Sequence, residues 1–192
     1  MIERRSPAGE FDASFGNGGI LAVRSGSPSS LALQGDGRIV FGSPGGDLCS
    51  KSGTLQRLLP DGAPDQTFGS GGVSEVLPLS VERISFDDQG RILLAGSASY
   101  GPCAKLVGSS SELAVARLQA NGSLDPSFGN SGVVRTHTEG KLEDVSASGL
   151  AVREDGTILV AGQGSSSGSP SGSLIAFSPM ARLIPPSATA GS

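Results

Sequence analysis

The chain is poor in aromatic residues and in the residue types that most often carry catalysis. Its 192 residues include no tryptophan, one tyrosine, one histidine and two cysteines, and aromatic residues make up 4% of the total. A core must therefore be built mainly from leucine, isoleucine and valine, with phenylalanine as the largest anchor. The sequence contains no Walker loop, no His-Glu-x-x-His pair and no Cys-x-x-Cys pair, which excludes the enzyme classes that these motifs define.

An excess of positive charge is also lacking. Lysine and arginine total 14 against 18 aspartates and glutamates, for a net charge of −4. Without a basic stripe, we expect no nucleic acid as a partner and no binding to an anionic membrane surface. No run of 18 apolar residues occurs, so no membrane span is predicted. Residues Met1–Arg5 carry charges without an apolar segment, and we expect no signal peptide in this chain.

Glycine, in contrast, is abundant, and much of it recurs at fixed positions. The motif Gly-x-x-Asp-x-[Ser/Thr]-Phe-Gly occurs at residues 9–16, 62–69 and 122–129. Three copies of a unit of about 60 residues are typical of propellers and solenoids, because one such unit cannot bury its own apolar face. The repetition therefore predicts the architecture, whereas it says little about the biochemical role.

Each unit contains four short runs of strand-forming residues. An Asp-Gly or Gln-Gly turn, at residues 36–37, 89–90 and 155–156, separates an alternating apolar pair from a more continuous apolar run. A third run precedes the next motif, and a fourth follows its Phe-Gly; the fourth runs are 19–23, 73–77 and 133–136. No segment shows sustained helical periodicity. We predict an all-β fold, a β-propeller-type array of three four-stranded antiparallel blades that is incomplete or open.

The repeats suggest one repeat domain with internal boundaries. The expected division is a stray strand of a preceding blade at 1–8, repeats at 9–61, 62–121 and 122–180, and a flexible tail at 181–192. Closed propellers usually have four to eight blades, so three blades indicate a fragment, a half that dimerises or an open array. Uncovered sheet faces and unpaired strand edges tend to associate with other chains. We therefore expect self-association through the terminal blades.

Two strings together carry a resemblance to a known family. The motif extended to Gly-x-x-Asp-x-[Ser/Thr]-Phe-Gly-x-x-Gly, with the downstream [Asp/Gln]-Gly-[Arg/Thr]-Ile, resembles the delta-60 repeat family over about residues 9–178. The resemblance implies a β-propeller and a bacterial protein of the cell envelope or a secreted one. It implies no catalytic residues and no cofactor.

The motif aspartates Asp12, Asp65 and Asp125 recur at one position, which raises the possibility of a metal site with one carboxylate per blade. Calcium loops need several closely spaced oxygen ligands, and each turn here offers one acid. We therefore expect these aspartates to cap backbone N–H groups of their turns. The same prediction applies to the acids of the Asp-Gly turns, Asp36, Asp88 and Asp155.

Cysteine and histidine are the remaining chemically distinctive residues. Cys49 and Cys103 each lie seven residues after a repeat glycine, and we expect them to be free or conditionally paired; a disulfide and a metal site are the alternatives. His137 lies among acids and hydroxyls in an insertion of the third copy. General acid–base chemistry is one interpretation, and a solvated surface loop is the one we favour.

The variable segments all fall at one predicted end of the array. They are Ser43–Gly53, Ser97–Glu112, Gln163–Ser173 and His137–Asp144, and they contain Lys51, Tyr100, Lys105 and both cysteines. Irregular loops on a rigid scaffold are where binding tends to reside, so we expect a ligand at this end. The predicted function is a non-enzymatic structural or binding scaffold for an unknown protein or carbohydrate, with no catalytic, cofactor-binding or metal residues. The alternative is an enzyme or lectin-like propeller with its site in these loops or in missing blades.

Overall fold

The described part of the chain is built from strands and turns. The computed structural model describes residues 1–23, 27–46, 51–100, 110–136, 143–166 and 169–177. These residues contain no helix, and hence none that is long and apolar enough to cross a membrane. The all-β prediction is therefore confirmed for the residues that the structure describes.

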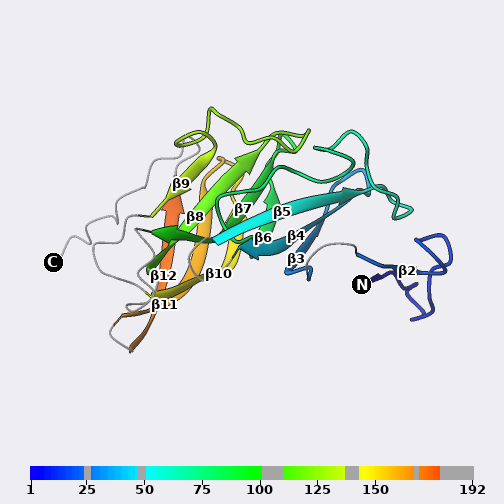
Figure 1. Ribbon diagram of the computed structural model, residues 1–192, viewed down its shortest axis with the longest axis horizontal. Coiled ribbons are helices and arrows are strands. Elements are labelled where there is room, and N and C mark those ends of the chain that lie inside the picture. Colours follow the sequence, from blue (N-terminus) through cyan, green and yellow to red (C-terminus); the bar gives the residue numbers. More distant parts are fainter. Residues whose placement is uncertain (24–26, 47–50, 101–109, 137–142, 167–168, 178–192) are drawn as a thin grey trace.

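The described residues contain twelve strands, which form four antiparallel sheets (Figure 1). The N-terminal strand pair contains β1 (Ile2–Glu3) and β2 (Ile20–Leu21). The first sheet contains β3 (Ser30–Leu33), β4 (Ile39–Gly46) and β5 (Lys51–Leu58). The second sheet contains β6 (Arg83–Phe86), β7 (Ile92–Tyr100), β8 (Ser110–Leu118) and β9 (Val133–Arg135). The third sheet contains β10 (Glu143–Val152), β11 (Ile158–Ser166) and β12 (Ser169–Phe177).

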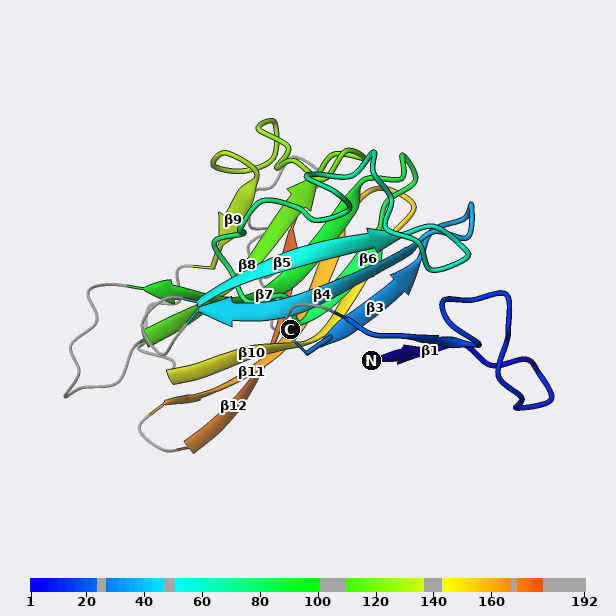
Figure 2. The same ribbon diagram turned by 45° about the vertical axis from the view of Figure 1, so that its right-hand side comes forward.

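The sheets follow one another in space in chain order. In Figure 1 the N-terminal strand pair lies at one side, followed by the first and second sheets, with the third sheet at the other side. The turned view of Figure 2 again places β1 beyond β3, on the N-terminal side of the first sheet. Each sheet thus packs on the sheets before and after it, as expected for a repeat array.

The number of strands differs from the predicted three blades of four. The second sheet has four strands in the order β6-β7-β8-β9, whereas the first and third have three among the described residues. In the first sheet, residues 73–77 occupy the fourth place through two isolated bridges, Gln56 to Val73 and Gly53 to Leu77. The spacing of these bridges is three residues on β5 and four on the other side. The extra residue interrupts the ladder, so a regular strand does not form.

The sheets are also offset from the sequence repeats. The run after Phe-Gly pairs with the strand before the motif: β9 pairs with β8, and Ala116 lies opposite Val133. The motif turn reverses the chain, so the following run returns antiparallel to the strand that preceded it. The second sheet therefore spans residues 83–135 and crosses the expected repeat boundary at 121. For the same reason the expected stray strand, which is β1, corresponds to the third strand of a sheet, and β2 corresponds to the fourth.

Three strands are longer than their composition suggested. The segments 43–53, 97–112 and 163–173 were expected as loops, but β4, β7 and β11 continue into them and pair with the returning strands, for example Gly45 with Ser52 and Ser99 with Ser111. Backbone hydrogen bonds of a ladder do not require apolar side chains, so glycine and serine are tolerated where the partner strand is already in place.

The core consists of apolar clusters between consecutive sheets. One cluster joins Val40 and Leu55 of the first sheet to Ile92 and Leu94 of the second. Another joins the opposite face of the second sheet to the third, and the last lies between the N-terminal strand pair and the first sheet. The recurring phenylalanines Phe15, Phe68 and Phe128 are fully buried in these clusters, one in each. Their predicted equivalent, buried positions are confirmed.

Candidate functional site

An arginine lies eight residues before each motif aspartate and pairs with it. The pairs are Arg4–Asp12, Arg57–Asp65 and Arg117–Asp125, at 2.9, 2.8 and 2.8 Å between Nε and Oδ2. Each guanidinium also lies over the ring of the motif phenylalanine, with Cζ 4.8, 4.6 and 4.6 Å from the centroid. We call each such set an Arg–Asp–Phe cluster. The three clusters have the same geometry, so they form part of the repeat itself.

The Arg–Asp–Phe cluster of one unit holds the turn of the next unit. Arg57 Nη1 donates a hydrogen bond to the carbonyl oxygen of Ala120 at 2.6 Å, and Arg4 Nη1 donates in the same way to Pro60. The amide of Gly69 donates to the carbonyl of Asn121 at 2.8 Å. These contacts connect successive sheets, and they give the recurring charged residues a structural role.

The motif carboxylates are saturated with hydrogen-bond donors. Asp65 Oδ1 accepts from the Thr67 amide at 3.0 Å and the Thr67 hydroxyl at 2.6 Å, and Oδ2 accepts from Arg57 and Arg38. Burial alone would raise the pKa of Asp65, but these hydrogen bonds and the Arg57 charge outweigh it and lower the pKa to about 2. The pKa of Asp125 is lowered by the same balance, with donors from Ser127 and Arg117. The predicted capping role of the motif aspartates is confirmed.

The Asp-Gly turns follow the prediction in two of three copies. Asp36 accepts from the amide of Arg38 at 3.0 Å, and Asp155 accepts from the amide of Thr157 at 2.8 Å. In the second copy the acceptor is Asp87, not the expected Asp88; it takes hydrogen bonds from the amides at positions 89 and 91. Gln89 occupies the aligned position there, and the Asp87 carboxylate, two residues before it, reaches the equivalent amide, that of Arg91.

In the sequence each cluster arginine lies five residues before the first glycine of a motif copy, but this alignment does not indicate its partner. The signal was available in the constant spacing of eight residues between arginine and aspartate. What the spacing alone could not indicate is that the turn folds back on its own strand: the amide of Asp65 donates to the carbonyl of Arg57 at 2.9 Å. That backbone contact brings the two side chains together.

Neither a metal cluster nor a nucleophile elbow is found among the described residues. Within them, no three His, Cys, Asp or Glu side chains are arranged to hold a metal ion. The letters of Gly164–Gly168 match Gly-x-Ser-x-Gly, but Gly164–Ser166 continue strand β11 along β12. A nucleophile elbow requires a sharp strand-to-helix turn, whereas residues 164–166 are extended strand.

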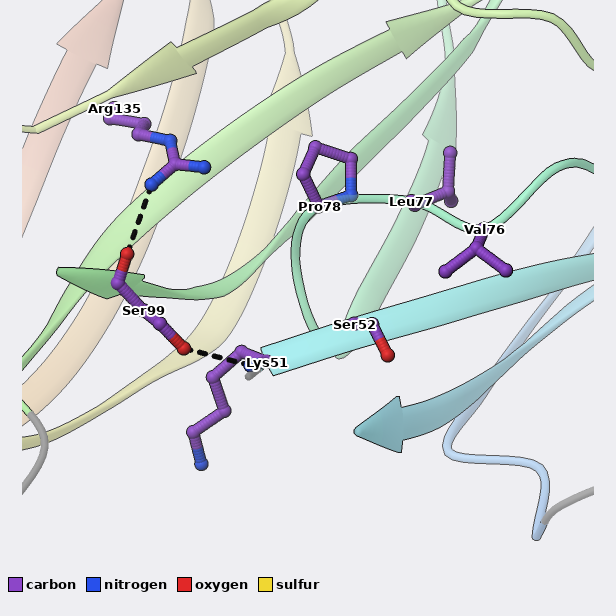
Figure 3. A pocket seen from close by; sticks show the side chains of 7 residues that line it. All are labelled: Lys51, Ser52, Val76, Leu77, Pro78, Ser99 and Arg135. Carbon is purple, nitrogen blue, oxygen red and sulfur yellow. Dashed lines mark hydrogen bonds between the residues drawn. The ribbon is translucent and has the colours of Figure 1, made fainter. Parts of the chain in front are cut away.

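A pocket opens at the end of the array opposite the Asp-Gly turns. It has a volume of about 390 Å³ and is lined by Lys51, Ser52, Val76, Leu77, Pro78, Ser99 and Arg135. Figure 3 shows Ser99 between Arg135 and Lys51, with the 76–78 segment across from them. The pocket thus lies where β5 begins and where β7 and β9 end, between the first and second sheets. This is the end that carries the variable segments.

Two cationic side chains give this pocket its charge. The Arg135 side chain is 42% exposed, and its Nη1 donates to the Ser99 carbonyl at 3.0 Å and lies 3.5 Å from Glu112 Oε1. The Lys51 amide donates to the Ser99 hydroxyl at 2.8 Å, so the hydroxyl acts as an acceptor there and can also donate its own proton. Glu112 offsets part of the Arg135 charge, whereas Lys51 forms no salt bridge with any described residue.

A second hollow adjoins the first along the edge of the second sheet. It has a volume of about 410 Å³ and is lined by Pro78, Leu124, Asn130, Ser131, Val133 and Arg135. Pro78 and Arg135 line both hollows. Arg135 therefore stands between a pocket of mixed polar and apolar lining and a more apolar one, an arrangement suited to an extended ligand.

The predicted site residues fall into two groups. Lys51 lines the pocket, and Tyr100 is the last residue of strand β7, next to Ser99 of the pocket. Cys49, Cys103, Lys105 and His137 lie outside the described residues. The structure adds Ser99 and Arg135, which sequence reasoning missed because only the packing of the second sheet on the first brings residues 51, 99 and 135 together.

Comparison with known families supports the propeller class. A family model described as "Domain of unknown function (DUF5122) beta-propeller" matches residues 90–128. The matched segment runs from the turn before β7 through β8 to the motif phenylalanine Phe128. The chain is thus similar to a β-propeller-type repeat family, and its all-β sheets agree with that class. No curated protein matches the chain.

Proposed function

We propose that this chain is a non-enzymatic β-propeller-type repeat module, of the delta-60 kind, that acts as a binding scaffold. Its sheets serve as blades, and its ligand binds at the end that carries the variable segments. The observation that carries the proposal is the different use of charge at the two ends. At the turn end the arginines and aspartates of the Arg–Asp–Phe clusters pair with one another, whereas Lys51 and Arg135 face the pocket.

The chemistry of the pocket favours a partner that presents a carboxylate group. The guanidinium of Arg135 offers a planar pair of donors, Lys51 adds a second positive charge, and the Ser99 hydroxyl can donate. The apolar side chains of Val76, Leu77 and Pro78 provide a wall for the rest of the ligand. Acidic peptides and acidic carbohydrates share this chemistry.

The test measures binding of the 192-residue chain to matched charged and neutral probes. Uronic-acid oligosaccharides and glutamate-rich peptides are compared with neutral counterparts by titration calorimetry. We expect the double variant Lys51→Gln/Arg135→Gln to weaken binding of the acidic probe at least about ten-fold, and binding to fall as salt rises.

Arg153→Gln is the matched control, because Arg153 is an exposed arginine in the β10–β11 turn at the other end of the array. An equal loss from the control and the pocket variant would contradict the proposed site. Turnover of the bound probe would favour the enzymatic alternative instead.

A further inference from the structure

Strand β3 exposes two leucines on a face that is buried elsewhere in the array. Leu31 is 50% exposed and Leu33 is 65% exposed. They lie directly opposite Phe41 and Ile39 of β4, and paired residues of adjacent strands point to the same face of a sheet. Phe41 and Ile39 are buried, so one half of this face is covered and the other half is open.

The equivalent pairs in the next two sheets are covered by the preceding sheet. Ile84 and Phe86 of β6 pack on the cluster that contains Val40 of the first sheet. Leu150 and Val152 of β10 pack on the cluster that contains Leu93 of the second sheet. In each case the first strand of one sheet meets the second strand of the sheet before it.

At the other end of the array, the outer face of the third sheet is also incompletely buried. Leu159 follows Ile158 in β11 as Val40 follows Ile39 in β4 and Leu93 follows Ile92 in β7, and the register of pairing is the same. Val40 is 0% exposed and Leu93 is 1% exposed, whereas Leu159 and its neighbour on the same face, Ala161, are only partly buried. The outer face of the third sheet thus corresponds to the face that covers the first strand of the following sheet elsewhere in the array. Leu31 and Leu33 of the first sheet have no such face packed on them within the chain.

We propose that copies of this chain associate head to tail, with the Leu159–Ala161 face of one copy packed on Leu31 and Leu33 of the next. The contact continues the two inter-sheet interfaces already present within the chain. It joins two different surfaces of the same molecule, and such heterologous contacts build rings or open arrays.

The N-terminal strand pair fits into this contact between two copies, which we call the joint. It covers Ile39, Phe41 and Leu58 and supplies the third and fourth strands, while β10 and β11 of the other copy supply the first and second. Both β1 and β12 correspond to the third strand, so one of them pairs with β11 in the joint. β1 carries Arg4 with its partners Asp12 and Phe15, whereas β12 has Ala176 at the aligned position. We infer that β1 takes this place, which requires β12 to leave the pairing with β11 that it has within one chain.

Sedimentation of the 192-residue chain under reducing conditions tests the association. We expect the mean mass to rise with concentration, and Leu33→Asp to raise the dissociation constant at least about ten-fold, because it places a charge in an apolar contact. Val76→Asp is the matched control: Val76 is 70% exposed but lies away from both terminal faces. Circular dichroism checks that both variants remain folded.

Cross-linking tests the direction of the contact. In a Cys49→Ser/Cys103→Ser background, a short bifunctional maleimide should join Leu33→Cys to Leu159→Cys between copies, and should join Val76→Cys to Leu159→Cys far less. A monomer at every concentration would overturn the proposal and leave the leucine face to another occupant, such as further repeats of a longer chain. Equal effects of the two aspartate variants, or equal cross-linking of the two pairs, would overturn it as well.

Discussion

At the scale of the residue, Asp65 combines the roles of turn cap and ion-pair partner in one side chain. Its Oδ1 holds the turn through Thr67, and its Oδ2 holds Arg57 and Arg38. A carboxylate that is buried in this way is stable only while it is charged and fully hydrogen-bonded. The Arg–Asp–Phe cluster therefore depends on ionisation.

The lowered pKa of Asp65 predicts a loss of stability in acid. The pKa is about 2 in the folded chain and 3.8 ordinarily, so its contribution is complete above pH 4 and is lost as the pH falls from 4 towards 2. We expect Asp65→Asn to be less stable than the wild type at pH 7 in urea unfolding, and the two curves to approach each other near pH 2. Curves that stay parallel from pH 7 to pH 2 would contradict the assignment.

At the scale of the element, the motif turn is defined by glycines with positive φ that the neighbouring unit approaches closely. Gly122 has φ +90°, and a Cβ there would lie 2.8 Å from Phe68 Cε2. Gly9 has a similar φ of +85°, but a Cβ there would meet no atom within 4 Å. A side chain at Gly9 would therefore cause backbone strain alone, whereas a side chain at Gly122 would cause backbone strain and steric overlap.

Alanine substitutions at these two glycines should differ in cost. We expect Gly9→Ala to lower the free energy of unfolding by about 1–2 kcal/mol through strain of the left-handed backbone. Gly122→Ala should cost a further ~1–3 kcal/mol, because the methyl group displaces the Phe68 ring. Chemical denaturation measures both. The double variant Gly122→Ala/Phe68→Leu should recover part of the excess; equal costs at the two glycines would contradict the contact.

At the scale of the whole molecule, each sheet is tied to the next by apolar clusters and by the Arg–Asp–Phe clusters. Val40 and Leu55 of the first sheet share a cluster with Ile92 of the second, and Arg57 reaches the carbonyl of Ala120. In an array of this kind, stability depends on the interfaces between neighbours as much as on each unit.

Loss of one inter-sheet arginine should therefore weaken the whole array. Arg57→Met leaves the Asp65 carboxylate buried without its main partner, and we expect a loss of about 3 kcal/mol, the low end for such pairs, since Arg38 remains beside it. Arg5→Met is the control, because the Arg5 side chain is 48% exposed and its change should stay within about 0.5 kcal/mol. Thermal or urea unfolding distinguishes them, and similar losses would argue against the inter-sheet role.

Much of this architecture follows from the sequence, because spacing in a repeat constrains every copy at once. The burial of Phe68, the capping by Asp65 and the grouping of the Asp-Gly and motif turns at one end could all be predicted. That grouping is visible in the Arg38–Asp65 contact of 2.9 Å. The strand partner of residues 133–136 could not be predicted, because alternation shows that a run is a strand but not which neighbour it joins.

The candidate pocket was harder to predict from the sequence than the fold was. Lys51 was singled out as a residue of the variable end, but Ser99 and Arg135 belong to a different sheet and have no repeated neighbour. Their proximity arises from the packing of the second sheet on the first. A site formed by such long-range contacts leaves no local pattern.

The offset between repeat and sheet has a consequence for how such a gene can change. Each unit donates the last strand of one sheet and the first three of the following one, as β9 and β10–β12 do. Duplicating or deleting one in-frame unit therefore splices the chain in the middle of a sheet, where the new neighbours have the same register and the same motif as the old ones. The number of repeats can then change during evolution while every junction keeps the same strand pairing and the same motif contacts.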